Sequence, residues 1–153
     1  MDEKGKSFLV RFLPAFFIPY LLIHFVPLEP LNAAVASTQN SFFEAAGFET
    51  ELDGSLLVIR GATEARYRII TDCSGIVMVI LFAALLYASK PSWKALLTYS
   101  PLLLAFNLLR LFATLFAGVQ FPALFEPAHA FFWFVDSGVV LLAWSHATGV
   151  RLW

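Results

Sequence analysis

The sequence predicts an all-α integral membrane protein with about four transmembrane helices and a small extracytoplasmic insertion made of an amphipathic helix and a β-hairpin. Of its 153 residues, 59% are hydrophobic and only 14% are charged, and the mean hydropathy is +0.76. Water-soluble domains are about half apolar, so this chain is too apolar to be one. The formal net charge of -1 gives no basic surface, so we expect membrane lipids and not nucleic acid as partners.

Apolar residues gather in segments that approach the roughly 20 residues a helix needs to cross a bilayer. Within a single membrane domain of residues 1–153, we expect spans at about 8–28, 74–89, 95–118 and 128–148. The first span contains Pro14 and Pro19, which membrane helices tolerate. The second is short for a span. No small-residue cleavage site follows the charged start of the chain, so we expect the first span to be retained and not removed as a signal peptide.

The long polar loop between the first two spans covers residues 29–72. Residues 33–46 predict a short amphipathic helix, which packs on the bilayer or on the other helices. Two β-prone runs then flank Asp53 and Gly54, a pattern that indicates a hairpin turn. A further extended piece at 66–70 leads to the second span. The hairpin is either a simple lid or spacer, or it shapes a cleft over the cysteine that follows.

The basic residues predict the orientation, because lysine and arginine are retained on the cytoplasmic side. On the side of the two termini lie Lys4, Lys6, Arg11, Lys90, Lys94 and Arg151. The other side carries Arg60, Arg66 and Arg68, in a loop long enough to weaken the rule. We therefore expect a multi-pass protein of the cell (inner or plasma) membrane with both termini cytoplasmic. The start of the second span and the start of the fourth then lie at the outer face.

Cys73 is the only cysteine, and it lies where the polar loop ends and an apolar run begins. A thiol at the water-facing end of a membrane helix lies near the positive end of the helix dipole. That position favours the thiolate, which is the nucleophilic form. A lone cysteine among apolar residues is otherwise an inert packing residue. Position alone leaves both interpretations open.

Arg110 lies inside the third expected span, where a guanidinium costs at least ~2.5 kcal/mol on insertion scales. It either reaches towards the interface or faces a wet cleft, which Asn107, one turn away, would share. His129 and Asp136 lie two turns apart on one face of the fourth span, and Asp136 falls about 12 Å from the outer end, near the depth of Arg110. We infer that Arg110 and Asp136 pair. The alternative is a protonated, hydrogen-bonded Asp136.

A thiol that opens a peptide bond needs one group to take and return a proton, and a donor for the developing oxyanion. His129 can supply the first function and Arg110 the second, whereas His146 lies at the opposite end of its span. A metal site built from Cys73, His129 and Asp72 is a weaker alternative. Its spacing matches no recognised zinc pattern and the chain has no HExxH motif, so we expect no metal and no cofactor.

Three features occur in a characteristic order along the chain. Cys-Ser-Gly at 73–75 begins one span, Asn-Leu-Leu-Arg at 107–110 lies inside the next, and His129 heads the last. In this order and membrane topology the chain resembles the exosortase/archaeosortase family of multi-span cysteine transpeptidases, over about residues 45–148. Its four expected spans are fewer than is usual, which resembles the compact branch of that family.

The resemblance implies an enzyme that cleaves exported proteins near a C-terminal motif followed by a transmembrane helix and a basic tail. Cys73 would form a thioester acyl-enzyme, and an amine on a lipid or surface component would release it. Arg110 would stabilise the oxyanion and His129 would act as acid and base, on the extracytoplasmic face. Supporting positions lie beside these three: Ser74, Asn107 and Asp136. The role of Asp136 rests on its placement and not on the resemblance.

A protein of another class fits the same composition. It would be a small membrane scaffold or accessory subunit without enzyme activity, in which Arg110 and Asp136 form only a structural ion pair. Such a protein should tolerate Cys73→Ala, whereas a transpeptidase should lose all processing.

Overall fold

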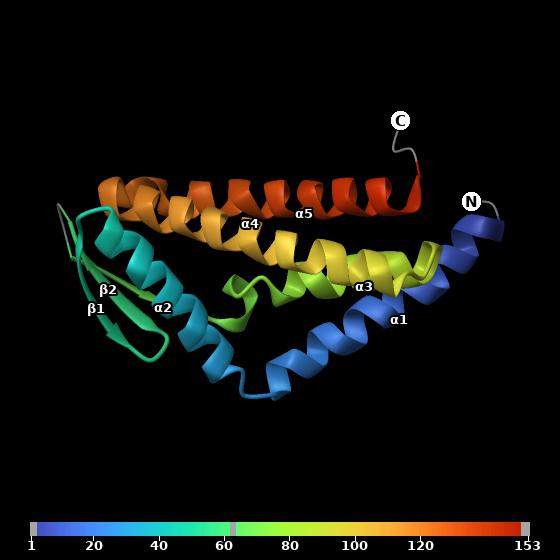
Figure 1. Cartoon of the computed structure of the whole chain (residues 1–153), viewed down its shortest axis with the longest axis horizontal. Helices are drawn as coiled ribbons and strands as arrows, with labels where there is room; N and C mark the ends of the chain where they lie inside the picture. The colour runs from blue at the N-terminus through green and yellow to red at the C-terminus, as the bar shows by residue number, and fades with distance from the viewer. Residues whose placement is uncertain (1–2, 62–63, 151–153) are drawn as a thin grey trace.

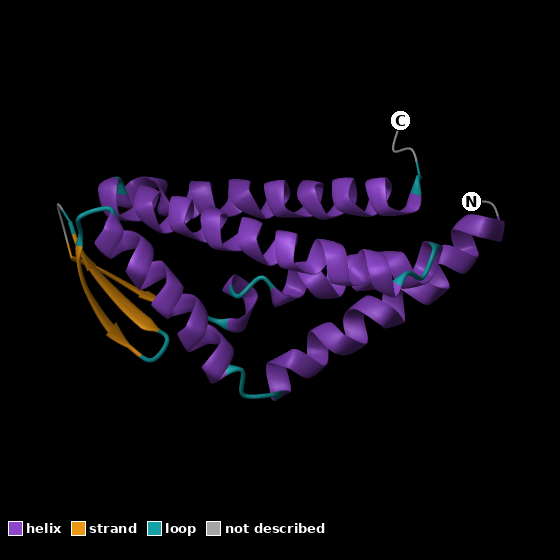
Figure 2. Cartoon of the chain, in the orientation of Figure 1, coloured by secondary structure: helices purple, strands orange, loops and turns teal. Residues whose placement is uncertain are grey.

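The computed structural model describes residues 3–61 and 64–150, and helices dominate it (Figures 1 and 2). The helices are α1 (Glu3–Phe25), α2 (Glu29–Ala45), α3 (Ile76–Ser89), α4 (Trp93–Gln120) and α5 (Phe125–Thr148). Helix α3 packs against α1, α4 and α5, and α4 packs against α5. Figure 1 shows the first turns of α1 and the last turns of α5 at one end of the molecule, and the strands with the end of α2 at the other.

Three of the helices are long and apolar enough to cross a membrane. These segments are Gly5–Phe25, Trp93–Gln120 and Pro122–Thr148. Helix α3 is apolar but has only 14 residues, about 21 Å of helix, so the expected span at 74–89 falls short of a full crossing. The first span ends at Phe25, before the expected residue 28, because Pro27 disfavours helical geometry at the residue before it.

The insertion after α1 contains the expected helix and hairpin, with two differences. Helix α2 begins at Glu29, four residues before the expected start, with a proline in its first turn where the missing N–H costs nothing. The hairpin turn is formed by Gly54 and Ser55, because Asp53 pairs with Leu56. Gly54 takes φ +58, which glycine adopts readily.

The extended piece after the hairpin adds a third strand. The sheet has the antiparallel order β1-β2-β3, with β1 (Glu49–Asp53), β2 (Leu56–Arg60) and β3 (Glu64–Arg68). Leu57 and Ile59 of the central strand are fully buried and pack with Phe43 of α2 and with Leu111 and Leu115 of α4. The amphipathic helix therefore packs on protein, and this core fixes the sheet and α2 to the second half of α4.

A second core joins the helices towards the termini. It contains Phe82 and Leu85 of α3, Leu103 of α4 and Val140 of α5. Beyond it, His146 contacts the hydroxyl of Tyr99 through Nδ1, and Trp144 donates to Ser89 at 2.8 Å. The turn that carries Cys73 packs against the first core, whereas His146 contacts Tyr99 beside the second.

Candidate functional site

Cys73 ends a short 3-10 helix, η1 (Thr71–Cys73), that leads into α3. Its N–H donates to Ile70 O at 2.9 Å, and the buried Ser74 hydroxyl donates to Thr71 O at 2.6 Å, so both residues are tied back into the turn. Gly75 then forms the N-cap of α3 with φ +83. The Cys-Ser-Gly sequence thus has a structural role, because these residues form the tight turn that leads into α3.

The Gly75 position leaves no room for a side chain. A Cβ there would lie 2.9 Å from Cγ of Asn107, and the left-handed φ already disfavours other residues. We expect Gly75→Ala to destabilise the protein by about 1–3 kcal/mol, measured by thermal unfolding in detergent. Gly138→Ala on α5 is the matched control, because nothing lies within 4 Å of its Cβ. Equal stability of the two variants would show that the turn is not strained against Asn107.

Asn107 connects the cysteine turn to α4. Its side chain is fully buried, and Nδ2 donates to Cys73 O at 2.9 Å. Its Oδ1 accepts from Nη2 of Arg110 at 3.3 Å. Asn107 therefore holds the backbone of Cys73 and orients Arg110 at the same time, a closer role than the shared helix face predicted for it.

Arg110 and Asp136 form the ion pair expected from their equal depth. Nη2 of Arg110 lies 2.6 Å from Oδ2 of Asp136, and the two side chains are only 3% and 11% exposed. The pairing offsets part of the cost of placing two charges in an apolar bundle. Arg110 points inward and does not reach for the interface. In the described part of the chain, its Nε and Nη1 have no hydrogen-bond partner, so two buried donors remain free for an anion.

His129 lies in the first half of α5 and shares a cavity with Cys73. The cavity has a volume of about 540 Å³ and is also lined by Ile70, Ala130 and Trp133. The His129 ring stacks on Phe125 with centroids 6.0 Å apart. No hydrogen bond occupies its nitrogens within the described residues, so the imidazole is free to exchange a proton.

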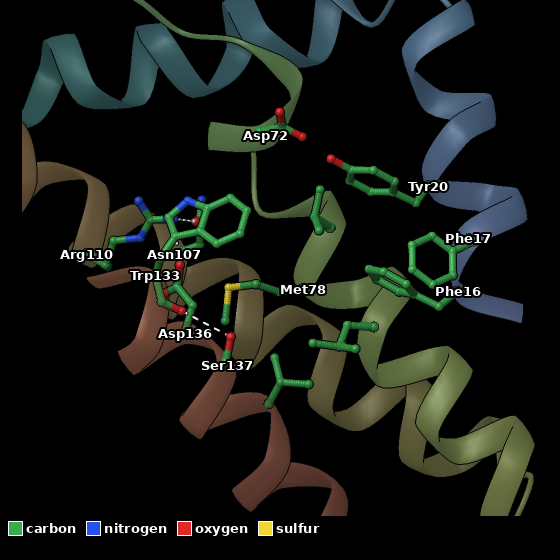
Figure 3. Close-up of a pocket in the computed structure, with 13 residues that line it drawn as sticks. Phe16, Phe17, Tyr20, Asp72, Met78, Asn107, Arg110, Trp133, Asp136 and Ser137 are labelled. Carbon is green, nitrogen blue, oxygen red and sulfur yellow. Dashed lines mark hydrogen bonds and ion pairs between the residues drawn. The ribbon is translucent and has the colours of Figure 1, made fainter. Parts of the chain in front are cut away.

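A second cavity, of about 330 Å³, holds Arg110, Asn107 and Asp136 (Figure 3). Its apolar walls come from α1, α3 and α5. Asp72 and Trp133 line both cavities, so the two adjoin. The structure thus places Cys73 and His129 on one cavity and Arg110 on its neighbour.

The thiol of Cys73 is not activated by position alone. Burial raises the pKa of Cys73, and the negative charge of Asp72 raises it further. A backbone hydrogen bond at Ile70 and the positive charge of Arg110 oppose this rise but do not cancel it. Desolvation therefore works against the thiolate that the position at the helix start was expected to favour. A base must remove the proton.

Two residues in or beside the cleft were not predicted as part of the site: Trp133 and His24. Trp133 stands between the cavities, and its spacing of four residues from His129 and three from Asp136 on one helix face was an available signal. His24 of α1 approaches Asp72, with Nε2 3.3 Å from Oδ1. Its Nδ1 donates to Tyr20 O one turn earlier in the same helix, at 2.7 Å. Nothing in the sequence pattern pairs His24 with Asp72.

Fold and site together define a multi-pass membrane protein in which a cysteine, a buried arginine and a histidine surround adjoining cavities. The transmembrane exosortase family (Exosortase_EpsH) matches residues 4–148. The chain belongs to this family. Comparisons with curated proteins and with solved structures found no match.

Proposed function

We propose that this protein is a membrane-embedded cysteine transpeptidase that cleaves the C-terminal sorting signals of exported proteins. Exosortases are generally cysteine transpeptidases, and the chain has the family's sequence over nearly its whole length. The observation that carries the proposal is the shared cavity of Cys73 and His129 beside a buried Arg110 with two free donors. The accessory-subunit alternative gives those free donors no role.

The first half-reaction would form an acyl-enzyme. His129 takes the proton of Cys73, as the raised pKa of the thiol requires. The sulfur attacks the carbonyl carbon of the substrate peptide, and the negative charge moves to the carbonyl oxygen, where Arg110 donates to it. The C–N bond then breaks, and His129 returns its proton to the leaving amine. A thioester on Cys73 remains.

The second half-reaction would transfer the substrate to an acceptor. An amine on a lipid or surface component attacks the thioester carbonyl, and His129 takes the proton that the amine loses. A new amide C–N bond forms, the C–S bond breaks, and the sulfur leaves as a thiolate that His129 reprotonates. Water in place of the amine would give simple cleavage.

The substrate's membrane helix would lie along the apolar wall of the smaller cavity. Phe16, Phe17, Val77 and Leu81 form this wall from α1 and α3, next to the polar group around Arg110. A helix lying there would bring the peptide bond before it to the level of Cys73. We place the cleft on the extracytoplasmic face of the inner or plasma membrane, because six of the ten basic residues in the sequence flank the spans on the opposite side in the expected topology.

The acyl-enzyme provides the direct test. The protein is incubated in detergent with an exported protein that ends in a short motif, an apolar helix and a basic tail. We expect a covalent adduct on Cys73 that hydroxylamine releases as a hydroxamate, detected by intact-protein mass spectrometry. A small primary amine should discharge the adduct to an amide. An adduct at another residue, or none with any substrate of this design, would contradict the proposal.

A further inference from the structure

His24 forms a pair with Asp72, which lines both cavities, and the proposed reaction does not use this pair. His24 lies in the last turn of α1, and its Nδ1 must carry a proton, because the Tyr20 carbonyl that it contacts can only accept. Its Nε2 lies 3.3 Å from Oδ1 of Asp72. A carboxylate also only accepts, so a favourable contact requires a proton on Nε2 or on the carboxyl group. A proton on Nε2 would turn this contact into an ion pair.

The charge of Asp72 lies close to the thiol of Cys73. Asp72 directly precedes Cys73, and it lines both cavities. Its Oδ1 is buried and accepts no hydrogen bond from the described residues, so its 3.3 Å contact with His24 Nε2 is one of charge and not a hydrogen bond. A free carboxylate charge at this place opposes the loss of a proton by the neighbouring thiol, because two negative charges would then lie close together.

The other charged groups around the thiol cannot compensate in the same way. Arg110 approaches from α4 but is already paired with Asp136, and His129 from α5 must stay neutral to act as a base. On α3 the titratable residue is Tyr87, near the other end of that helix. The acidic residues of α2 face elsewhere, near Gly54 and at Asn40 and Thr50: Glu29 and Glu44. His24 is thus the cation that can balance Asp72.

We propose that His24 is a positioning residue that, as an imidazolium, neutralises Asp72 and holds its carboxylate on the α1 side of the cleft, so that Cys73 gives up its proton readily. The catalytic benefit of this arrangement rests on the proposed function, whereas the contact between His24 and Asp72 does not. It also gives α1 a role, because packing of α1 on α3 brings His24 to Asp72. Docking of α1 and readiness of the thiol are thereby linked.

Alkylation of the thiol tests this without any substrate. Cys73 is the only cysteine, so the rate of iodoacetamide labelling of the full chain in detergent reports on this thiol alone. We expect His24→Leu to shift the labelling profile to higher pH and to slow labelling about tenfold near neutral pH. Asp72→Asn should speed labelling. In the Asp72→Asn background, His24→Leu should have no further effect.

Two further variants separate charge from packing. His24→Lys keeps a cation within reach of Asp72 and should restore most of the labelling rate. His146→Leu, at the Tyr99 contact at the far end of the bundle, is the control and should label like the wild type. Equal slowing by His24→Leu with and without Asp72 would show that His24 acts through helix packing. That result, an unshifted profile in His24→Leu, or no rescue by lysine, would each overturn the inference. Failure of the acyl-enzyme test would leave it intact.

Discussion

Cys73→Ala is expected to abolish processing of a sorting-signal substrate completely. The variant removes the sulfur that forms the acyl-enzyme, and no second cysteine exists to replace it. Cys73 is only partly buried and its side chain is small, so stability should change by no more than about 1 kcal/mol. Co-expression with a tagged substrate, read as the loss of its C-terminal helix on a gel, measures the effect.

Cys73→Ser is the matched variant, because it keeps the size of the side chain and replaces the thiol with a far less acidic hydroxyl. We expect it to be as inactive as Cys73→Ala, since His129 cannot generate an alkoxide as readily as a thiolate. Full processing by either variant would favour the accessory subunit, in which another protein supplies the nucleophile. Partial processing by the serine variant alone would still place the nucleophile at residue 73.

The sequence predicts best the features that depend on local periodicity and on counting. An α-helix rises a fixed distance per residue, so the common depth of Arg110 and Asp136 followed from their distances to the helix ends. The two β-prone runs gave the hairpin. The turn moved by one residue, to Gly54 and Ser55, because pairing of the whole register decides which residues form the loop.

The sequence predicts poorly what depends on the packing of separate elements. The contact between His24 and Asp72 arises only after α1 has packed on α3. No pattern along the chain predicts how these two helices are oriented relative to each other. The burial of the thiol is a second example. A helix dipole is visible from position, whereas the extent to which Cys73 is desolvated depends on neighbours from other helices. The helix dipole and desolvation shift the pKa of the thiol in opposite directions, and the positions of the neighbouring residues decide which of the two is larger.

The pair of Arg110 and Asp136 gives the second large effect, because removing one charge strands the other in the bundle. We expect Arg110→Met to cost about 3–5 kcal/mol of stability, since Asp136 then remains buried without a partner. Asp136→Leu should cost a similar amount by stranding Arg110. The double variant should recover most of the loss, because apolar residues can replace a buried ion pair at little cost. Thermal unfolding in detergent measures all four proteins.

Substrate processing by these four proteins should not change in parallel with their stability. This difference separates the structural role of Arg110 from its role as oxyanion donor. Loss of an oxyanion donor costs about 10²–10³ in rate, and the double variant lacks the donor just as Arg110→Met does. We therefore expect the double variant to be stable and inactive. Additive losses of stability would show that the two side chains are not coupled, despite their 2.6 Å contact. Recovery of processing in the double variant would show that Arg110 serves only the fold, and the oxyanion would then need another donor.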